Sequence, residues 1–159
     1  MTASAMRFLM ADRLRWHWRN VPLPEPHLGL LAAGLILQRA RPKPLSAVGR
    51  IRRVAGWCCI ASGIALAAWA TGAAAELDLE RPDRLVRLGP YAMSRNPMYV
   101  GWTGIYLGMA LVANTRWLIL LLPMLLALVH FTTCAEEREL KNRFGDNYRA
   151  YMRRVRRYL

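Results

Sequence analysis

The sequence predicts an all-α integral membrane protein with about four transmembrane helices, a helical hairpin and a C-terminal amphipathic helical segment. The chain is 55% hydrophobic yet carries a formal net charge of +13, and these two properties occupy different parts of the sequence. Residues 54–75 and 117–135 contain no Asp, Glu, Lys or Arg. At about 1.5 Å per residue, helices of these lengths approach the roughly 30 Å of a bilayer core. The alternative is a soluble bundle with unusually long buried helices, which the segment lengths disfavour.

The N-terminal half predicts a surface helix followed by two spans. Residues 1–20 combine apolar and basic side chains at helical spacing and contain two tryptophans, which is typical of an interfacial helix. A frayed polar tail is the alternative. Residues 21–75 are expected to hold two spans. The first, 21–37, contains Glu25 and three prolines, and the second is the uncharged segment from residue 54.

A polar loop, a helical hairpin and a basic C-terminal region are expected within residues 76–159. A third apolar segment, 99–113, is separated from the fourth only by residues 114–116, which predicts an antiparallel hairpin. Gly104 and Gly108 have the spacing of closely packed membrane helices. No internal repeat or low-complexity segment divides the chain, so we expect a single domain, residues 1–159.

The basic tail is expected to form two short helices. Gly145 is suited to the end of the first helix, and Asp146 to the N-cap of the second. Aromatic and apolar side chains recur at helical spacing through the tail, with arginines on the remaining surface. This pattern is typical of a helix lying on an anionic membrane face.

The distribution of basic residues predicts the orientation. With four spans, residues 1–20, 76–98 and 136–159 share one side and carry most of the 23 Lys and Arg residues. The positive-inside rule makes that side cytoplasmic. We therefore expect residues 1–20, 76–98 and 136–159 to face the cytoplasm. The basic segment 39–53 is the exception: either it lies on the membrane surface, or the first apolar segment is re-entrant.

Some kinds of partner are not expected. The basic residues flank apolar segments and no nucleic-acid motif accompanies them, so we expect no nucleic-acid partner. The cysteines, Cys58, Cys59 and Cys134, show neither a CxxC spacing nor a nearby pair of histidines. We therefore expect no metal site, and we interpret the three cysteines as small buried apolar residues.

The stretch LGPYAMSRNPMYVG concentrates turn and polar residues at the start of the third apolar segment. Pro97 disfavours a helical conformation at Asn96, so Asn96 is suited to the N-cap and Pro97 to the first turn. The free N–H groups of such a helix start attract an anionic group, and Arg95 adds positive charge. The stretch predicts either a nest for a small ligand with a carboxylate or phosphate, or an ordinary capped helix with interfacial tyrosines.

Two carboxylates, Glu136 and Glu137, directly follow the fourth apolar segment. In an antiparallel hairpin they return towards the start of the third segment. Carboxylates at a membrane boundary are costly without a partner. They either pair with arginines such as Arg95 or Arg138, or face a cationic ligand.

Two stretches, LVRLGPYAMSRNPMYVGW and EERELKNRFGDNYRAYMRRV, occur in this order around the predicted hairpin. Together they resemble the isoprenylcysteine carboxyl methyltransferase family and its phospholipid methyltransferase relatives, over roughly residues 76–156. The resemblance is to a small, bacterial-type member, which implies a protein of the bacterial inner (plasma) membrane. It also implies S-adenosyl-L-methionine as cofactor, in an active-site pocket that faces the cytoplasm. It departs from the family at Asn96, where His is more usual, and at Thr132, where eukaryotic members carry Arg. The cofactor-binding residues that it implies are Leu85, Val86, Tyr91, Asn96, Pro97, Met98, Tyr99 and Glu136.

The resemblance implies methyl transfer to a lipid-like acceptor, which needs its nucleophile in line and about 3–3.5 Å from the methyl carbon. A carboxylate nucleophile needs no base, whereas an amine must lose a proton, with His130, Glu136 or Glu137 as candidate bases. A core histidine with a hydrogen-bonded partner is the favoured interpretation of His130. The candidate catalytic residues are Glu136, Glu137 and Arg95.

The expected partners are the lipid bilayer and an amphiphilic acceptor that enters sideways from it. Carboxyl O-methylation of an isoprenylcysteine-type substrate is favoured over phospholipid N-methylation. An NADPH-dependent sterol-type membrane reductase and a non-catalytic membrane scaffold remain alternatives, and the sequence leaves the oligomeric state open.

Overall fold

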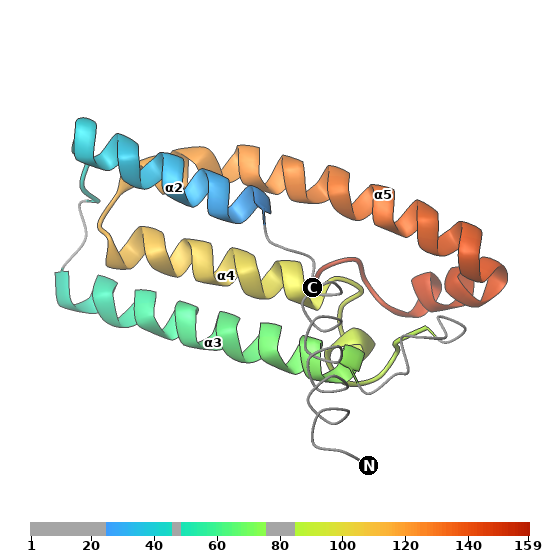
Figure 1. Ribbon diagram of the computed structural model, residues 1–159. Coiled ribbons are helices and arrows are strands. Elements are labelled where there is room, and N and C mark those ends of the chain that lie inside the picture. The colour runs from blue at the N-terminus through green and yellow to red at the C-terminus, as the bar shows by residue number, and fades with distance from the viewer. Residues whose placement is uncertain (1–24, 46–48, 76–84) are drawn as a thin grey trace, which may run out of the picture.

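The computed structural model describes residues 25–45, 49–75 and 85–159 (Figure 1). Regular structure in these ranges is helical, which confirms the all-α class. Successive long helices run in opposite directions, so the starts of α2 and α4 lie at the same end of the bundle as the end of α3. The elements are α2 (Glu25–Ala40), α3 (Gly49–Ala75), the 3₁₀ helix η1 (Gly89–Ala92), α4 (Pro97–Val112) and α5 (Arg116–Arg154).

Two helices, α3 and α5, are long and apolar enough to cross a membrane. Large apolar side chains such as Trp57, Trp69 and Phe131 point outwards from them. Helices α2 and α4 have 16 residues each, and their length of about 24 Å falls short of a bilayer core. The four predicted spans are therefore not confirmed. The predicted interfacial helix 1–20 lies outside the described residues, as do positions 21–24 and 76–84.

Glycines allow α3 and α4 to pack with their backbones in contact. A Cβ atom added at Gly63 of α3 would lie 2.6 Å from the carbonyl oxygen of Gly101 in α4. One added at Gly108 would lie 2.6 Å from the carbonyl oxygen of Gly56. Gly104 has more room, with its nearest neighbours at 3.7 Å. The predicted small-residue packing is thus confirmed at Gly108, and it recurs two turns earlier at Gly101.

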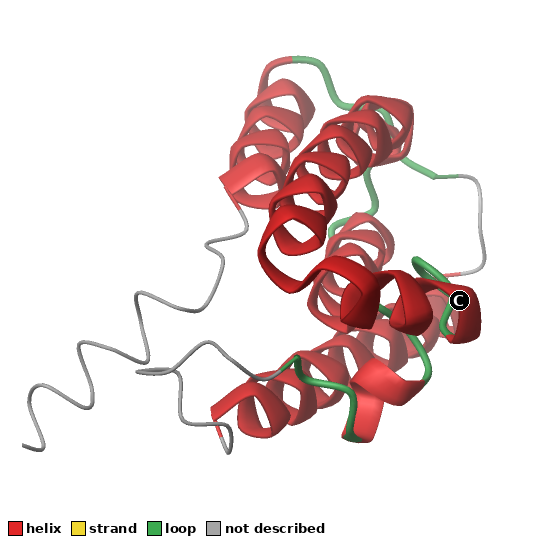
Figure 2. Ribbon diagram, turned by 90° about the vertical axis from the view of Figure 1, so that its right-hand side faces the viewer, coloured by secondary structure: helices red, strands yellow, loops and turns green. Residues whose placement is uncertain are grey.

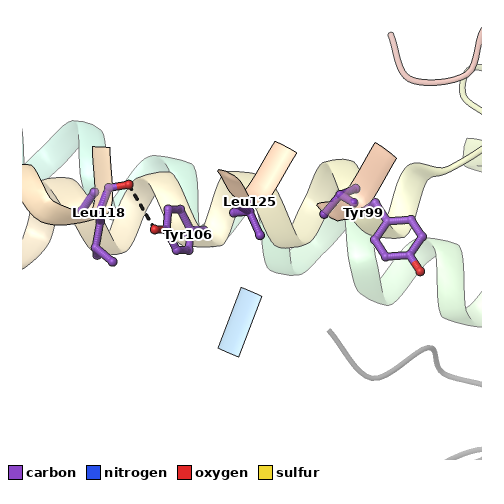
Figure 3. Packing of buried hydrophobic residues seen from close by; sticks show 6 residues of the cluster. Tyr99, Tyr106, Leu118 and Leu125 are labelled. Atoms are coloured by element: carbon purple, nitrogen blue, oxygen red, sulfur yellow. Dashed lines mark hydrogen bonds between the residues drawn. The ribbon is translucent and has the colours of Figure 1, made fainter. Parts of the chain in front are cut away.

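Helix α2 packs against α5 rather than against its sequence neighbour α3 (Figure 1). A Cβ atom at Gly34 of α2 would overlap the Leu118 side chain of α5. The Tyr106 hydroxyl of α4 donates a hydrogen bond of 3.0 Å to the Leu118 carbonyl oxygen (Figure 3). The buried core joins α4 to α5 and consists of Tyr99, Tyr106, Ala110, Leu118, Leu125 and Val129.

A tight turn joins α4 to α5, as predicted. Asn114 adopts a left-handed conformation with φ of 52°, and its side-chain oxygen accepts a hydrogen bond of 3.0 Å from the Leu45 N–H. The Thr115 side chain caps α5 by accepting a hydrogen bond from the Trp117 N–H. The turn is therefore fixed at the end of the bundle opposite to Glu136 and Glu137.

Two predictions about burial are wrong. Cys58 is exposed, and Cys59 and Cys134 are half-buried, because these positions lie off the packed faces of α3 and α5. His130 is also exposed rather than in the core, although it has a partner: its Nδ1 atom lies 3.3 Å from the Tyr158 hydroxyl. Its other ring nitrogen lies 3.6 Å from the Cys134 sulfur.

Candidate active site

The start of α4 is where the sequence predicts it, but Asn96 does not use its side chain as a cap. Asn96 precedes Pro97 at the N-cap position, and no side-chain cap hydrogen bond is present. Its Nδ2 atom instead donates a 3.0 Å hydrogen bond to the Arg157 carbonyl oxygen. The Ser94 hydroxyl donates to the same oxygen over 3.3 Å and accepts from the Asn96 N–H over 3.1 Å. The predicted capping role of the Asn96 side chain is therefore wrong, because a distant carbonyl group takes it.

That carbonyl belongs to residues 155–158, which we call the C-terminal strap. The chain can fold back because Gly145 interrupts α5 with φ of 51° and ψ of −125°, which confirms the predicted break. Seen from this end of the bundle, the last turns of α5 lie across the other helices (Figure 2). The Arg95 N–H donates a 2.9 Å hydrogen bond to the Arg156 carbonyl oxygen, and Ser94 and Arg156 form a parallel bridge.

The aromatic side chains of the tail cover protein rather than only a membrane face. Tyr148 and Tyr151 are both buried. The Tyr151 hydroxyl donates a 2.6 Å hydrogen bond to the Tyr91 carbonyl oxygen, and Arg87 donates to the Asn147 carbonyl oxygen over 2.9 Å. The tail therefore holds the loop before α4 in place from 3₁₀ helix η1 to Asn96.

Helix α5 brings Glu136 back to the start of α4, as the hairpin predicts. The Tyr99 hydroxyl donates a 2.8 Å hydrogen bond to Glu136 Oε1. Glu136 is half-buried, and its Oε2 atom makes no hydrogen bond or ion pair with any residue in the described ranges. One carboxylate oxygen is thus fixed by the protein, and the other is available to a ligand.

Glu137 occupies a different environment, although it is the next residue. Only 3% of it is exposed. The Arg157 guanidinium donates two hydrogen bonds to its carboxylate, of 3.1 Å from Nε and 2.9 Å from an Nη atom. Arg95 forms a second ion pair with this carboxylate at 3.4 Å. Both Glu137 oxygens are therefore engaged, which matches the pairing with Arg95 that the sequence left open.

Arg95 has more donors than Glu137 uses. Its side chain is only 9% exposed, and its Nε and one Nη atom are buried without a partner among the residues the structure describes. Two guanidinium groups face a single buried carboxylate, so the cluster of Arg95, Glu137 and Arg157 has an excess positive charge. Unpaired buried N–H groups are costly, so these donors are expected to have a partner in a functional state.

Tyr91 adds a neutral phenol to this end of the molecule. Burial, and to a smaller extent the Glu136 carboxylate, raises the pKa of Tyr91 to about 12. The hydroxyl therefore stays protonated at physiological pH and remains a hydrogen-bond donor. Pro97 and Met98 are buried at the helix start, whereas Leu85 and Val86 are half-buried in the loop that leads to η1.

The structure thus joins the predicted residues in two pairs, Tyr99 with Glu136 and Arg95 with Glu137. A comparison with protein families tests whether the chain belongs to a known family. The family model described as phospholipid methyltransferase matches residues 51–147. The chain belongs to the phospholipid methyltransferase family. Comparison with curated proteins and with solved structures finds no significant match.

Membership of the phospholipid methyltransferase family confirms the resemblance seen in the sequence and implies a membrane methyltransferase. Methyltransferases of this family generally use S-adenosyl-L-methionine. The matched range contains the Gly-Pro turn, the start of α4 and both glutamates. It includes all the predicted site residues, from Leu85 to Glu137.

Several residues at this end of the phospholipid methyltransferase fold were not among the sequence predictions. Arg157 and Ser94 were missed because their contact spans some 60 residues of chain through irregular backbone, for which no periodicity exists. His27, whose ring stacks on that of Tyr99, was missed because its segment is interrupted by prolines. The buried aromatic stripe of the tail was visible, but its pattern fits a lipid surface as well as a protein surface.

Proposed function

We propose that the protein transfers a methyl group from S-adenosyl-L-methionine to a lipid-like acceptor at the membrane interface. The favoured reaction is carboxyl O-methylation of an isoprenylcysteine-type substrate. The observation that carries the proposal is the hydrogen bond between Tyr99 and Glu136. This hydrogen bond joins the two sequence stretches that carry the family resemblance, at the end of the α4–α5 hairpin opposite to the turn. Arg95, which has unpartnered donors, lies in the loop directly before α4.

The charges at this end suit a zwitterionic cofactor. Glu136 Oε2 is available to the cationic ammonium group of the methionine moiety. The unpartnered Nε and Nη donors of Arg95 are suited to its carboxylate. The neutral Tyr91 hydroxyl adds a donor for a ribose or carboxylate oxygen. NADPH carries several phosphates, which would require more free cationic donors than this cluster offers.

When bound, the cofactor supplies a sulfonium methyl group that is already electrophilic. The protein's part is then to position the groups and to exclude water. Tyr99 fixes one oxygen of Glu136 in place, and the pairing with Glu137 fixes Arg95. Glu137 itself, with both oxygens held by arginines, is suited to supporting Arg95 rather than to accepting a proton.

We favour a carboxylate as the acceptor head group, because few residues at the site are suited to removing a proton from an amine. His130 lies on the outer surface of α5 and contacts Tyr158 and Cys134. Glu137 is fully paired. A carboxylate acceptor needs no base. Its apolar tail can remain in the lipid beside the outward-facing apolar side chains of α5.

The test is transfer of a labelled methyl group by the detergent-solubilised full chain, after cofactor binding has been established by titration. N-acetyl-farnesylcysteine, phosphatidylethanolamine and unprenylated N-acetylcysteine serve as acceptors. We expect turnover of the farnesylated carboxylate only. Equal turnover of N-acetylcysteine would contradict entry of the acceptor from the bilayer. Turnover of phosphatidylethanolamine alone would make the protein an N-methyltransferase, and tighter binding of NADPH would favour a reductase.

A further inference from the structure

His27, near the start of α2, lies at the candidate site but outside the region that the family model matches. It is 4% exposed. Its imidazole ring stacks on the Tyr99 ring, with centroids 6.4 Å apart and planes inclined by 14°. Since the Tyr99 hydroxyl bonds to Glu136, the three side chains form a continuous group that connects α2, α4 and α5.

One ring nitrogen of His27 has a partner and the other has none. Nε2 lies 3.1 Å from the Thr103 hydroxyl oxygen. Nδ1 is buried and makes no hydrogen bond within the described parts of the chain. A buried polar atom that the fold itself leaves unsatisfied requires an explanation.

Counting hydrogens indicates which nitrogen carries the proton. If Nε2 were protonated and donated to Thr103, the hydroxyl hydrogen of Thr103 and the Nδ1 lone pair would both lack a partner. If the Thr103 hydroxyl donates to Nε2, the only unsatisfied group is the N–H at Nδ1. The second tautomer leaves fewer groups unpaired. In this tautomer His27 presents a hydrogen-bond donor next to Tyr99.

We propose that His27 is a specificity-determining residue whose Nδ1–H binds one carboxylate oxygen of the methyl acceptor. This inference rests on the proposed function and identifies the acceptor head group as anionic. A protonated amine has no lone pair to offer an N–H donor, so the same contact would disfavour an ammonium head group. Among the described residues, the titratable groups connected to His27 by ring stacking or hydrogen bonding are Tyr99 and Glu136, and the exposed Glu25 lies two positions earlier in α2.

The contact is compatible with the reaction. The second carboxylate oxygen remains free to attack the methyl carbon. A C–O bond forms while the S–CH₃ bond breaks, and the bonding electron pair moves to sulfur. The carboxylate and the sulfonium both become neutral, and no proton is transferred, so His27 keeps its proton throughout.

Two substitutions separate the roles of the two ring nitrogens. Glutamine places a polar group near the Nε2 position and can still bond to Thr103, but it leaves nothing at the Nδ1 position. Asparagine does the reverse. We expect His27→Gln to raise the KM for N-acetyl-farnesylcysteine about tenfold, the loss expected for a hydrogen bond to a charged group. The dissociation constant of S-adenosyl-L-methionine should change less than about twofold, and His27→Asn should stay closer to wild type in KM.

A purely structural role would give a different result. Glutamine, which retains the Thr103 contact, would then match wild type, whereas His27→Asn and Thr103→Val would both raise the KM about tenfold. That order of effects would overturn the proposal.

A binding measurement tests the proposal without turnover. The thermal shift of the full chain is compared for N-acetyl-farnesylcysteine and for farnesylcysteamine, which has an ammonium head group. Wild type should be stabilised more by the carboxylate, and His27→Gln should lose that preference. A preference for the ammonium compound would overturn the proposal, since it requires a lone pair at Nδ1. If the preference is as expected but no methyl transfer occurs, the proposed function fails and the role of His27 in binding stands.

Discussion

Glu136 and Glu137 are adjacent in the sequence but differ in what surrounds them. Glu136 has one hydrogen bond, from the Tyr99 hydroxyl, and is half-buried. Glu137 is buried and binds two arginines, Arg95 and Arg157. Successive residues of a helix are rotated by about 100°, so the two side chains leave α5 in different directions. One carboxylate is therefore suited to a ligand and the other to the internal cluster.

The first prediction concerns cofactor binding. Glu136→Gln keeps an oxygen that accepts the Tyr99 hydrogen bond but removes the negative charge. Because a hydrogen bond to a charged group contributes about 1.5–3 kcal/mol, we expect the affinity for S-adenosyl-L-methionine to fall about tenfold or more. Isothermal titration of the purified protein measures this. Unchanged affinity in the folded variant would remove Glu136 from the cofactor site.

The second prediction concerns stability. Glu137→Ala leaves the buried Arg95 guanidinium without a counter-ion. Removing one partner of a buried ion pair typically costs about 3–5 kcal/mol, so we expect a clear fall in the thermal unfolding temperature. Arg138→Ala, which changes an exposed side chain one position further along α5, is the matched control. If both variants unfold at the wild-type temperature, the ion cluster does not stabilise the fold.

Residues of the site differ in how well the sequence predicts them. The contact between Tyr99 and Glu136 follows from a short turn and two regular helices, so their spacing along the chain determines it. The sequence predicts that the Asn96 side chain caps its own helix, because that hydrogen bond involves only neighbouring residues. It binds Arg157 instead, because the fold-back after Gly145 brings a carbonyl group there, and no regular spacing encodes that contact.

At the scale of the helices, α3 and α4 form the most closely packed pair. Gly56 and Gly63 in α3 face Gly101 and Gly108 in α4, so the two backbones approach without intervening side chains. The glycine spacing indicated close packing, but a single sequence does not identify the partner helix. The chain order made α5 the obvious neighbour of α4, whereas the closest partner is α3.

A pair of substitutions in α3 tests this packing. Gly63→Ala places a Cβ atom 2.6 Å from the Gly101 carbonyl oxygen and 3.0 Å from the Ile105 backbone nitrogen, so backbone must move. We expect a loss of about 1–3 kcal/mol in the free energy of unfolding. Gly72→Ala, in the same helix with nothing within 4 Å, should be neutral or stabilising by up to about 1 kcal/mol. Denaturation in mixed micelles compares them, and equal effects would contradict the close approach of the helices.

At the scale of the whole molecule, two helices have the length and apolarity to cross a membrane. The four spans expected from the sequence are not confirmed, because apolar composition alone does not give helix length. Pro97 and the turn at residues 113–115 limit α4 to Pro97–Val112, and α2 is described over Glu25–Ala40. Shorter helices can still lie at membrane depth when longer neighbours cover them.

Orientation provides the fourth prediction. Single cysteines are introduced at two exposed positions, Pro42 just after α2 and Asn147 near the end of α5, in a background lacking Cys58, Cys59 and Cys134. The ends of α2 and α5 lie at opposite ends of the bundle (Figure 1). Position 115 in the turn is unsuitable because Thr115 is fully buried. Membrane-impermeant maleimide applied to spheroplasts should label position 42, and position 147 should react only after the membrane is opened. Labelling of both from one side would contradict the antiparallel crossing of α5.

The four long helices that the structure describes pack most closely as two pairs, α3 with α4 and α2 with α5. The two pairs are joined by the α4–α5 turn at one end, by the buried core between α4 and α5, and by the contacts of the C-terminal strap at the other end. The residues of the site lie at the other end, on both pairs: Tyr99 on α4, His27 on α2, Glu136 and Glu137 on α5. The hydrogen bond between Tyr99 and Glu136 and the contacts of Ser94 and Asn96 with the Arg157 carbonyl oxygen therefore close the open end of the hairpin. These contacts would have to break before a lipid tail could pass between α4 and α5, so the residues proposed to bind ligands also hold the two helix pairs together.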